Sequence, residues 1–213
     1  MARMEIHTLP AGPIQTNAFL VLDREAGRAV LIDAPHGVWA EVSPALKEAG
    51  ARLEALLLTH AHWDHTGDAA IIQATGVPVY AHEADRPLYE NPSIQEPFSI
   101  PGIQIPVVRM DHAVAQGDRL QIAGQQIEVR HVPGHCRGNV LFYFPALDTA
   151  FVGDAIFAGG VGRTDFPGCS MEVLENSIRT QIYTLPPETR LLAGHGPATT
   201  VARERATNPF VSG

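Results

Sequence analysis

The chain has 213 residues, of which 45% are apolar and 18% are charged, a balance that is ordinary for a water-soluble enzyme. Its formal charge of −8 argues against a nucleic-acid partner, because contacts with phosphate groups require a basic surface. A transmembrane helix is not expected, since no apolar run reaches the roughly eighteen residues that a bilayer requires. Residues 1–5 lack the apolar core of a signal peptide, so we expect one cytoplasmic domain over residues 1–213, without membrane contact.

The apolar pattern predicts an α/β protein in which strands and helices occur in two similar halves. Strands are expected over residues 4–9, 18–23, 29–33, 55–58, 78–80, 119–122, 127–132, 140–144, 150–152 and 190–192. Helices are expected over residues 38–49, 68–75, 171–183 and 198–206. Gly50 and Gly76 lie where the first two helices should end, and Ser170 is the expected N-cap of the third. Each half begins with antiparallel strands and continues into a helix, which suits two sheets packed face to face with helices outside.

Residues 59–65 read Thr-His-Ala-His-Trp-Asp-His and follow a short apolar run that predicts a buried strand. If the backbone stays extended, His60 and His62 point in the same direction, because strand side chains alternate with a period of two. Asp64 and His65 follow where the chain must turn, so they can face a second point nearby. Imidazole and carboxylate ligands suit zinc, iron or manganese, and four such side chains at one strand end indicate a metal site.

Three further turns, all containing glycine, offer additional ligands. His135 ends the sequence His-Val-Pro-Gly-His, Asp154 ends Phe-Val-Gly-Asp, and His195 lies in Gly-His-Gly-Pro. Each residue follows an apolar segment or a tight turn, which is how sheet enzymes present functional groups at strand ends. A site for two metal ions needs about seven protein ligands. These three residues would complete the set that begins in residues 60–65.

The motifs His-x-His-x-Asp-His, Pro-Gly-His, Gly-Asp and Gly-His-Gly, in this order, resemble the metallo-β-lactamase superfamily, and within it the small glyoxalase-II-like (hydroxyacylglutathione hydrolase-like) enzymes. The loop 162–168 and the segment 194–210 extend the resemblance over nearly the whole chain. It implies a four-layer αβ/βα sandwich with the metals along one edge, where the two halves meet. It also implies two divalent metal ions, with zinc as the expected metal and iron or manganese as alternatives. In this family pattern His60, His62 and His135 hold one ion, Asp64, His65 and His195 hold the other, and Asp154 bridges them.

Such a site permits a specific chemistry. Two divalent ions roughly 3.5–4 Å apart lower the pKa of a bridging water to around 7, which provides a hydroxide nucleophile at neutral pH. One ion can also polarise the substrate carbonyl and hold the developing oxyanion. Asp64 and Asp154 are therefore the expected catalytic residues, Asp64 by orienting the proton of the nucleophile. The reaction is hydrolysis of an ester-like bond in a small-molecule substrate, and the resemblance points to a thioester such as S-lactoylglutathione.

Two other functions are compatible with these motifs. The sequence Gly-Arg-Thr-Asp-Phe at residues 162–166 also resembles the persulfide dioxygenases, in which two His and one Asp hold one iron. The presence of Asp64, His65 and His195 favours two metals over that mononuclear site. The third alternative is a lactonase, a phosphoesterase or a weak β-lactamase that uses the same two ions.

Three polar residues are candidate substrate contacts. Arg163 can anchor an anionic substrate, and a salt bridge between Arg163 and Asp165 is an equally weighted alternative. Asp165 stands in a loop where the family tends to place an aromatic residue. Arg137 could also reach the cleft. Cys136, beside His135, is expected to be a small buried side chain rather than a third kind of metal ligand.

Two features are left open by the sequence. The segment 91–109 contains four prolines, and it is either a loop that shapes the active site or an inert connection. Metal-bound imidazoles usually lean on outer-shell partners, and His131 is the first candidate for that role, with Asp33 as a second. The oligomeric state is not predicted.

Overall fold

The computed structural model describes residues 4–213. Residues 1–3 belong to the segment in which no signal peptide is expected, and they lie outside the described part. The first of two central sheets has the strand order β1-β2-β3-β4-β5-β6. Its strands are β1 (Met4–Ala11), β2 (Thr16–Asp23), β3 (Arg28–Ile32), β4 (Arg52–Leu57), β5 (Val79–His82) and β6 (His112–Val114). The first three strands pair antiparallel, and β3 to β6 run parallel.

The second sheet has the order β14-β13-β10-β9-β8-β7. Its strands are β7 (Arg119–Ile122), β8 (Gln125–His131), β9 (Val140–Phe144), β10 (Thr149–Gly153), β13 (Arg190–Ala193) and β14 (Thr199–Thr200). Strands β7 to β10 are antiparallel, whereas β13 runs parallel to β10. A small hairpin, β11 (Ile156–Phe157) with β12 (Gly160–Val161), follows β10.

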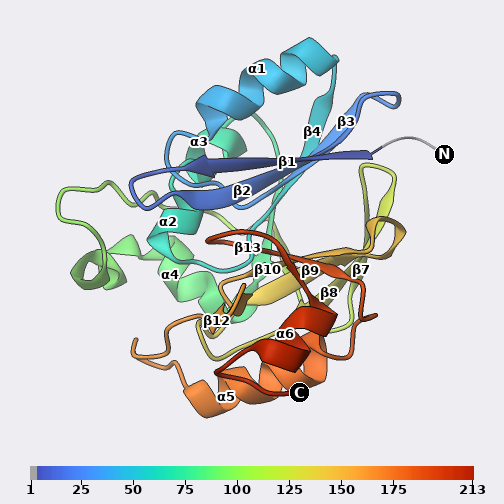
Figure 1. The fold of residues 1–213 in the computed structure, drawn as a ribbon. Helices are drawn as coiled ribbons and strands as arrows, with labels where there is room; N and C mark the ends of the chain where they lie inside the picture. Colours follow the sequence, from blue (N-terminus) through green and yellow to red (C-terminus); the bar gives the residue numbers. More distant parts are fainter. Residues whose placement is uncertain (1–3) are drawn as a thin grey trace.

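Helices cover the outer face of each sheet, which produces four layers (Figure 1). The first half contributes α1 (Trp39–Ala49), α2 (Trp63–Thr66) and α3 (Ala69–Gln73). The second contributes α5 (Met171–Ser177), which continues as the π-helical turn η5 (Ile178–Ile182), and α6 (Val201–Thr207). Between β5 and β6 lie η1 (Glu83–Asp85), α4 (Arg86–Glu90), η2 (Pro92–Ile94) and η3 (Glu96–Phe98), and η4 (Pro145–Leu147) joins β9 to β10. Within residues 4–213, none of these helices is both long and apolar enough to traverse a lipid bilayer.

Alternation along strand β2 explains why the protein has several apolar layers. All of its side chains are buried. Leu20 and Leu22 pack with Val42 of helix α1, whereas Phe19 and Val21 pack into the space between the two sheets. Successive strand residues point to opposite faces, so the central part of a strand that is buried on both faces is apolar, as in residues 18–22.

The second sheet repeats this arrangement with its own helices. Phe142 of β9 belongs to the core between the sheets, and the adjacent Leu141 packs with Leu174 of α5 and Val201 of α6. Three apolar cores therefore separate four layers. The predicted αβ/βα sandwich is confirmed.

Most predicted elements are present, with errors at short elements and at boundaries. Ser170 caps α5 by accepting a hydrogen bond from the backbone N–H of Val173, and Gly50 ends α1 with a left-handed φ of 60°. The helix predicted from residue 198 is wrong at its start, because Thr199–Thr200 forms strand β14 and Thr200 then caps α6. Strand β6 is absent from the prediction. Strands of two or three residues carry no readable periodicity.

The topology gathers the ends of several strands at one edge. Parallel strands end on the same side, so the residues after β3, β4 and β5 lie together at the edge of the first sheet. The residues after β10 and β13 lie together in the second sheet for the same reason. All the predicted ligand motifs follow strands that end at these edges.

Candidate metal centre

Three of the predicted ligands converge from two different loops. After β4 the chain continues without regular structure to His62, which is extended (φ −61°, ψ 143°) and starts helix α2. A ligand atom of His60, one of His62 and one of His135 all lie within 4.8 Å of one another. His135 comes from the loop after β8, where Gly134 adopts φ 130° and packs against the backbone of Leu174, so only glycine fits. The two histidines of the His-x-His motif therefore present ligand atoms to the same place, as expected.

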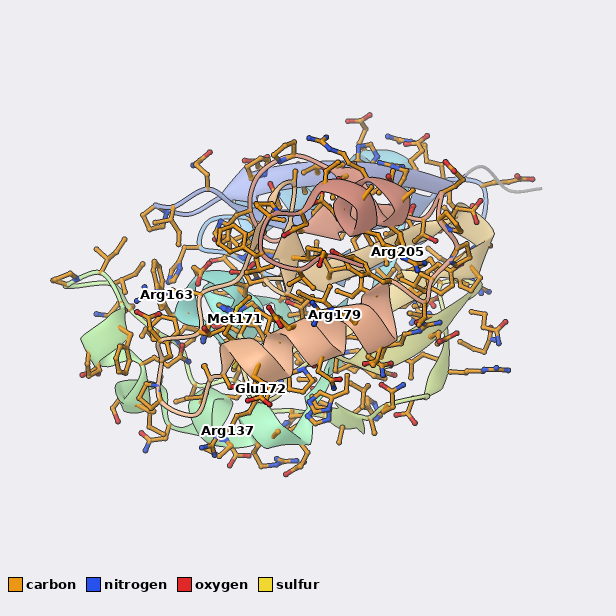
Figure 2. The ribbon with its side chains drawn as sticks, turned by 60° about the horizontal axis from the view of Figure 1, so that its bottom comes forward. Arg137, Arg163, Met171, Glu172, Arg179 and Arg205 are labelled. Atoms are coloured by element: carbon orange, nitrogen blue, oxygen red, sulfur yellow. The ribbon has the colours of Figure 1, made fainter. Side chains whose placement is uncertain are left out.

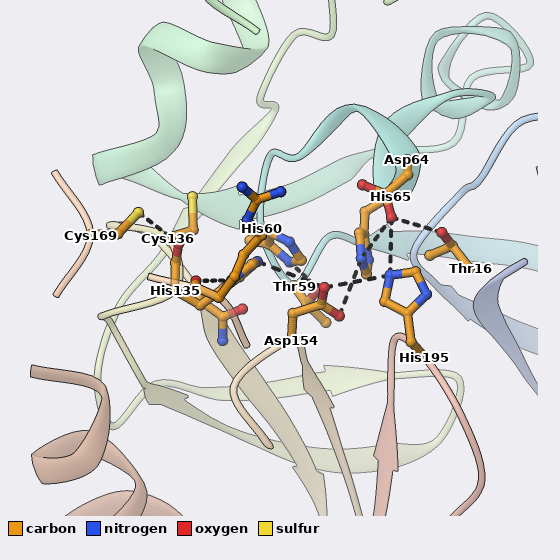
Figure 3. Close-up of polar contacts among 12 residues, drawn as sticks. Thr16, Thr59, His60, Asp64, His65, His135, Cys136, Asp154, Cys169 and His195 are labelled. Carbon is orange, nitrogen blue, oxygen red and sulfur yellow. Dashed lines mark hydrogen bonds and ion pairs between the residues drawn. The ribbon is translucent and has the colours of Figure 1, made fainter. Parts of the chain in front are cut away.

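The remaining four predicted ligands form a second, adjoining set (Figure 3). Helix α2 turns the chain, so that Nε2 of His65 lies 3.3 Å from Oδ2 of Asp64. Nε2 of His195 lies 3.3 Å from the same Asp64 oxygen. Asp154 stands between the sets: its Oδ1 is 3.4 Å from Nε2 of His65, and its Oδ2 is 3.7 Å from Nε2 of His135 and 3.5 Å from Nε2 of His195. The structure therefore brings all seven predicted residues together.

The hydrogen bonding of this cluster fits a cation site. Nε2 of His60, His65 and His135 and Oδ1 of Asp154 are buried, and the described residues supply no hydrogen-bond partner for these four atoms. Buried polar atoms are normally paired, so a group of unpaired nitrogen and oxygen atoms facing one point requires an explanation. Imidazole nitrogens and carboxylate oxygens are the ligands that zinc, iron and manganese accept. The donor set fits the implied metals.

Burial and neighbouring charges set the protonation states of the ligand side chains. Burial, followed by repulsion from neighbouring imidazoles, lowers the pKa of His60 well below its usual value and that of His62 to about 3. Burial would raise the pKa of Asp64, but the charge of His65 and hydrogen bonds from His195 and Thr16 lower it. The pKa of Asp154 is lowered in the same way, with His65 as the strongest opposing charge. The carboxylates are thus ionised and these two imidazoles neutral, as ligands must be. Burial opposes protonation of His65 and His195, but Asp64 and Asp154 raise the pKa of both, so this side of the cluster favours positive charge.

Outer-shell partners hold the far nitrogens of at least two ligand imidazoles, His65 and His135. Nδ1 of His65 lies 2.8 Å from Oδ2 of Asp33, and Nδ1 of His135 lies 2.8 Å from the carbonyl oxygen of Arg163. Asp33 also accepts hydrogen bonds from the N–H and the hydroxyl of Thr59. Such contacts fix the ring orientation and leave Nε2 pointing at the centre. The expectation for Asp33 agrees with this geometry.

His131 does not take the expected outer-shell position. Its Nε2 lies 2.8 Å from the carbonyl oxygen of Arg137, and its ring stacks on His82 at 4.1 Å between centroids. His131 is the last residue of β8, and neither of these contacts is with a ligand imidazole. It ties down the loop that carries His135 rather than the imidazole itself.

Asp85 is an outer-shell residue that the sequence did not reveal. It is 1% exposed and accepts hydrogen bonds from the backbone N–H groups of Ala61 (3.1 Å) and Gly138 (2.6 Å). Ala61 lies between His60 and His62, and Gly138 lies three residues after His135. One carboxylate therefore joins the two loops that carry the first ligand set.

Cys136 completes the surroundings of Asp85. Its buried Sγ donates to the Asp85 carboxylate at 3.1 and 3.2 Å, so Cys136 is a structural side chain, as expected, and not a ligand. Burial, and then the neighbouring Asp85, raises the pKa of the Cys136 thiol well above its usual value, which keeps it a donor. Gln95 also holds the loop that carries His60 and His62, by donating a hydrogen bond to the carbonyl oxygen of Ala61 at 2.8 Å.

Asp85→Asn is expected to weaken the first ligand set selectively. An amide offers one acceptor oxygen where the carboxylate uses two, and its NH₂ group would face an N–H donor. Losses of outer-shell partners typically cost about 10–100-fold in metal affinity or activity. Elemental analysis should find one ion retained and the other depleted, with activity reduced to match. The control is Asp23→Asn, a 5%-exposed carboxylate that accepts from Ala26 at the end of β2, outside the site. Equal metal content in both variants would refute the positioning role of Asp85.

A pocket of about 680 Å³ opens directly over the cluster. His62, Asp64, His135, Asp154 and His195 all line it. This size lies within the range of small-molecule sites. The segment 91–109 is not an inert connection, because Ile94, Gln95 and Phe98 form part of the wall.

The three candidate substrate contacts differ in their partners and in whether they line the pocket. Arg163 forms a two-pronged salt bridge with Asp165, with both N–O distances 2.7 Å, and its guanidinium lies 4.1 Å above the ring of Phe166. Arg163 and Arg137 line the pocket, whereas Asp165 does not. Asp165 is therefore the ion-pair partner of Arg163, and Arg137 remains a candidate substrate contact.

Comparison with known proteins agrees with this geometry. The family model described as the metallo-beta-lactamase superfamily matches residues 11–195. Hydroxyacylglutathione hydrolase GloC of Haemophilus influenzae is 36% identical over 213 residues, covering 98% of this chain and 99% of its own length.

Two solved structures are also similar over nearly the whole chain. BLEG-1, a B3 metallo-beta-lactamase, has a TM-score of 0.91 at 34% identity, covering 98% of this chain and all of its own. TTHA1623, crystallised in a di-iron-bound form, has a TM-score of 0.83 at 39% identity, covering 96% of this chain and all of its own. These matches confirm the resemblance drawn from the motifs. The chain belongs to the metallo-β-lactamase superfamily.

Proposed function

We propose that this protein uses two divalent metal ions to hydrolyse thioesters such as S-lactoylglutathione. Zinc is the first choice for both ions. The observation that carries the proposal is a double set of ligand-type side chains on the floor of one pocket. The hydroxyacylglutathione hydrolase named among the relatives supports the thioester, and the di-iron form of TTHA1623 supports iron as the alternative metal.

The proposed ligand assignment divides the seven residues into two groups joined by a carboxylate. Asp154 is the proposed bridge, because its two oxygens approach different histidines and it lies within 3.7 Å of both groups. The first ion is assigned to His60, His62 and His135, and the second to Asp64, His65 and His195.

The residues of the chain prepare the reaction in three ways. Bound metals would supply an activated water and a polarised carbonyl, the chemistry of two-metal hydrolases. Asp64 is held by the hydroxyl of Thr16 at 2.7 Å and lines the pocket, so its ionised carboxylate can orient an attacking water by accepting a hydrogen bond. Water adds to the acyl carbon and the C–S bond breaks, which gives a carboxylate, a thiol and one proton without any change of oxidation state. A thiolate leaves more readily than an alkoxide, so a thioester needs little help from a general acid.

Metal analysis and an oxygen-free assay test the proposal together. Protein grown in metal-replete medium should contain about two ions per chain. It should release thiol from S-lactoylglutathione under nitrogen, followed with a chromogenic thiol reagent. Glutathione persulfide, assayed by oxygen uptake, is the parallel arm. One tightly held iron, oxygen uptake on persulfide and no thioester cleavage would replace this proposal with a persulfide dioxygenase.

Hydrolysis of β-lactams is the second candidate function. The similarity to BLEG-1 favours it, because that protein is a metallo-beta-lactamase of the same overall fold. A chromogenic cephalosporin in the same assay separates the two activities. Cleavage of the cephalosporin with kcat/KM well above that for any thioester would make the β-lactam the preferred substrate class.

A further inference from the structure

We infer, on the basis of the proposed thioester hydrolysis, that the preferred substrate is a thioester with one apolar group and one negative charge. The pocket places an apolar wall beside the metal ligands, and Arg137 is the one arginine of its lining that has no ion pair within residues 4–213. This chemistry fits an aromatic or medium-chain acyl group better than the short polar lactoyl group, and a monoanionic thiol better than glutathione.

Three large apolar side chains in the wall of the pocket are exposed to solvent. Ile14, Ile94 and Phe98 are 44%, 44% and 46% exposed, and all three line the pocket. They come from two separate segments, the β1–β2 turn and the connection between β5 and β6. Large apolar side chains left in water around a cavity mark a surface that binds an apolar group.

Two successive aromatic contacts connect the apolar wall with the metal ligands. Phe98 packs edge-on against Phe166 at 5.3 Å between centroids, and Phe166 packs against the ring of His62 at 5.1 Å. The two loops that hold these phenylalanines therefore meet directly above the first ligand set. A group bound at Phe98 and Phe166 lies next to the reacting carbonyl, where its contacts affect the rate as well as the affinity.

The charges along the pocket point to one anionic group. Asp165 neutralises Arg163, as described above, and Asp85 is buried and fully hydrogen-bonded. The exposed guanidinium of Arg137 lies over the α-carbon of Gly168 and has no ion pair with any residue of the described chain. Figure 2 shows both arginines at the end of the molecule that carries the segment between β5 and β6. Glutathione, with two carboxylates and an ammonium group, would leave most of its charges unpaired here.

Matched thioesters test the apolar preference. The substrates are S-acetyl- and S-hexanoyl-N-acetylcysteine, which share one carboxylate and differ only in the acyl chain. kcat/KM should be about tenfold higher for the hexanoyl compound, because part of its extra methylene surface is buried. Phe98→Ala should reduce that ratio toward one. The matched control Phe210→Ala removes a phenylalanine that is 56% exposed outside the pocket, and it should leave the ratio intact.

The charge is tested with S-hexanoyl-N-acetylcysteamine, which lacks the carboxylate. Arg137→Gln should lower kcat/KM about fivefold for the cysteine thioester and not for the neutral one, the size expected of an exposed ion pair. Arg119→Gln is the control, since Arg119 is exposed, lies on β7 and does not line the pocket. An equal loss on both substrates, or a best kcat/KM on S-lactoylglutathione, would overturn the inference while leaving thioester hydrolysis intact.

Binding of uncleavable analogues keeps the inference testable if no thioester is hydrolysed. S-hexyl- and S-ethyl-N-acetylcysteine are thioethers, and their Kd values can be measured by calorimetry on the metal-loaded protein. The hexyl compound should bind about tenfold more tightly, and Phe98→Ala should remove the difference. Equal affinities would refute the apolar site, whereas a hexyl preference without catalysis would refute only the proposed reaction.

Discussion

Asp154→Ala is expected to abolish most activity and to reduce metal content. The carboxylate lies within 3.7 Å of His65, His135 and His195, so its loss leaves both ligand sets without their shared oxygen donor. Stabilisation of transition-state charge by bound metals is worth several kcal/mol, and each factor of ten in rate corresponds to about 1.4 kcal/mol. A loss of about a thousandfold in kcat/KM is therefore expected, measured together with elemental analysis.

The conservative variant separates charge from shape. Asp154→Asn keeps one oxygen and the volume of the side chain, so it should retain more metal than the alanine variant and still lose most activity. Circular dichroism should report an intact fold in both, because Asp154 follows β10 and belongs to none of the apolar cores. Two ions per chain and near-normal activity in the alanine variant would show that the bridge has been misassigned.

The parts of the site that the sequence predicted are those encoded in short contiguous patterns. Four of the seven clustered residues fall within residues 60–65, and the other three directly follow strand-like runs or a tight turn. Strands are also predictable where continuous apolar runs are long enough, as in β2 and β9. Ends of parallel strands must meet at one edge, so the sequence could predict which residues would come together.

The missed features depend on contacts between distant segments. Asp85 lies in a short helical stretch where an acidic residue usually faces solvent, and its partners are 24 to 53 residues away in the chain. Gln95 reaches Ala61 across 34 residues, from a segment without regular periodicity. The sequence favours His131 for an outer-shell role because metal-bound imidazoles usually lean on such partners. Its place at the end of β8 instead turns it toward the carbonyl oxygen of Arg137.

Gly194→Ala is expected to damage the metal centre without straining the backbone. Gly194 follows β13, its N–H donates to the carbonyl oxygen of Gly153 at 2.9 Å, and its φ does not lie in the left-handed region. Alanine is therefore allowed by the main chain. A methyl group built there would overlap Oδ1 of Asp154 and the ring of His65, both of which are buried and cannot move aside. Displacing ligands by an ångström or less can cost about a hundredfold in activity.

A second glycine provides the opposite kind of control. Gly117 has φ 86° and nothing within 4 Å of the position where a methyl group would lie, so Gly117→Ala is strained but causes no overlap. An L-residue in this conformation costs roughly 1–2 kcal/mol. Gly117→Ala should therefore lower the unfolding midpoint and keep full activity and metal content, whereas Gly194→Ala should lose metal and activity with a smaller effect on unfolding. If both variants lost only stability, Gly194 would be required for the fold alone. The close approach of Gly194 to Asp154 would then not determine the geometry of the metal centre.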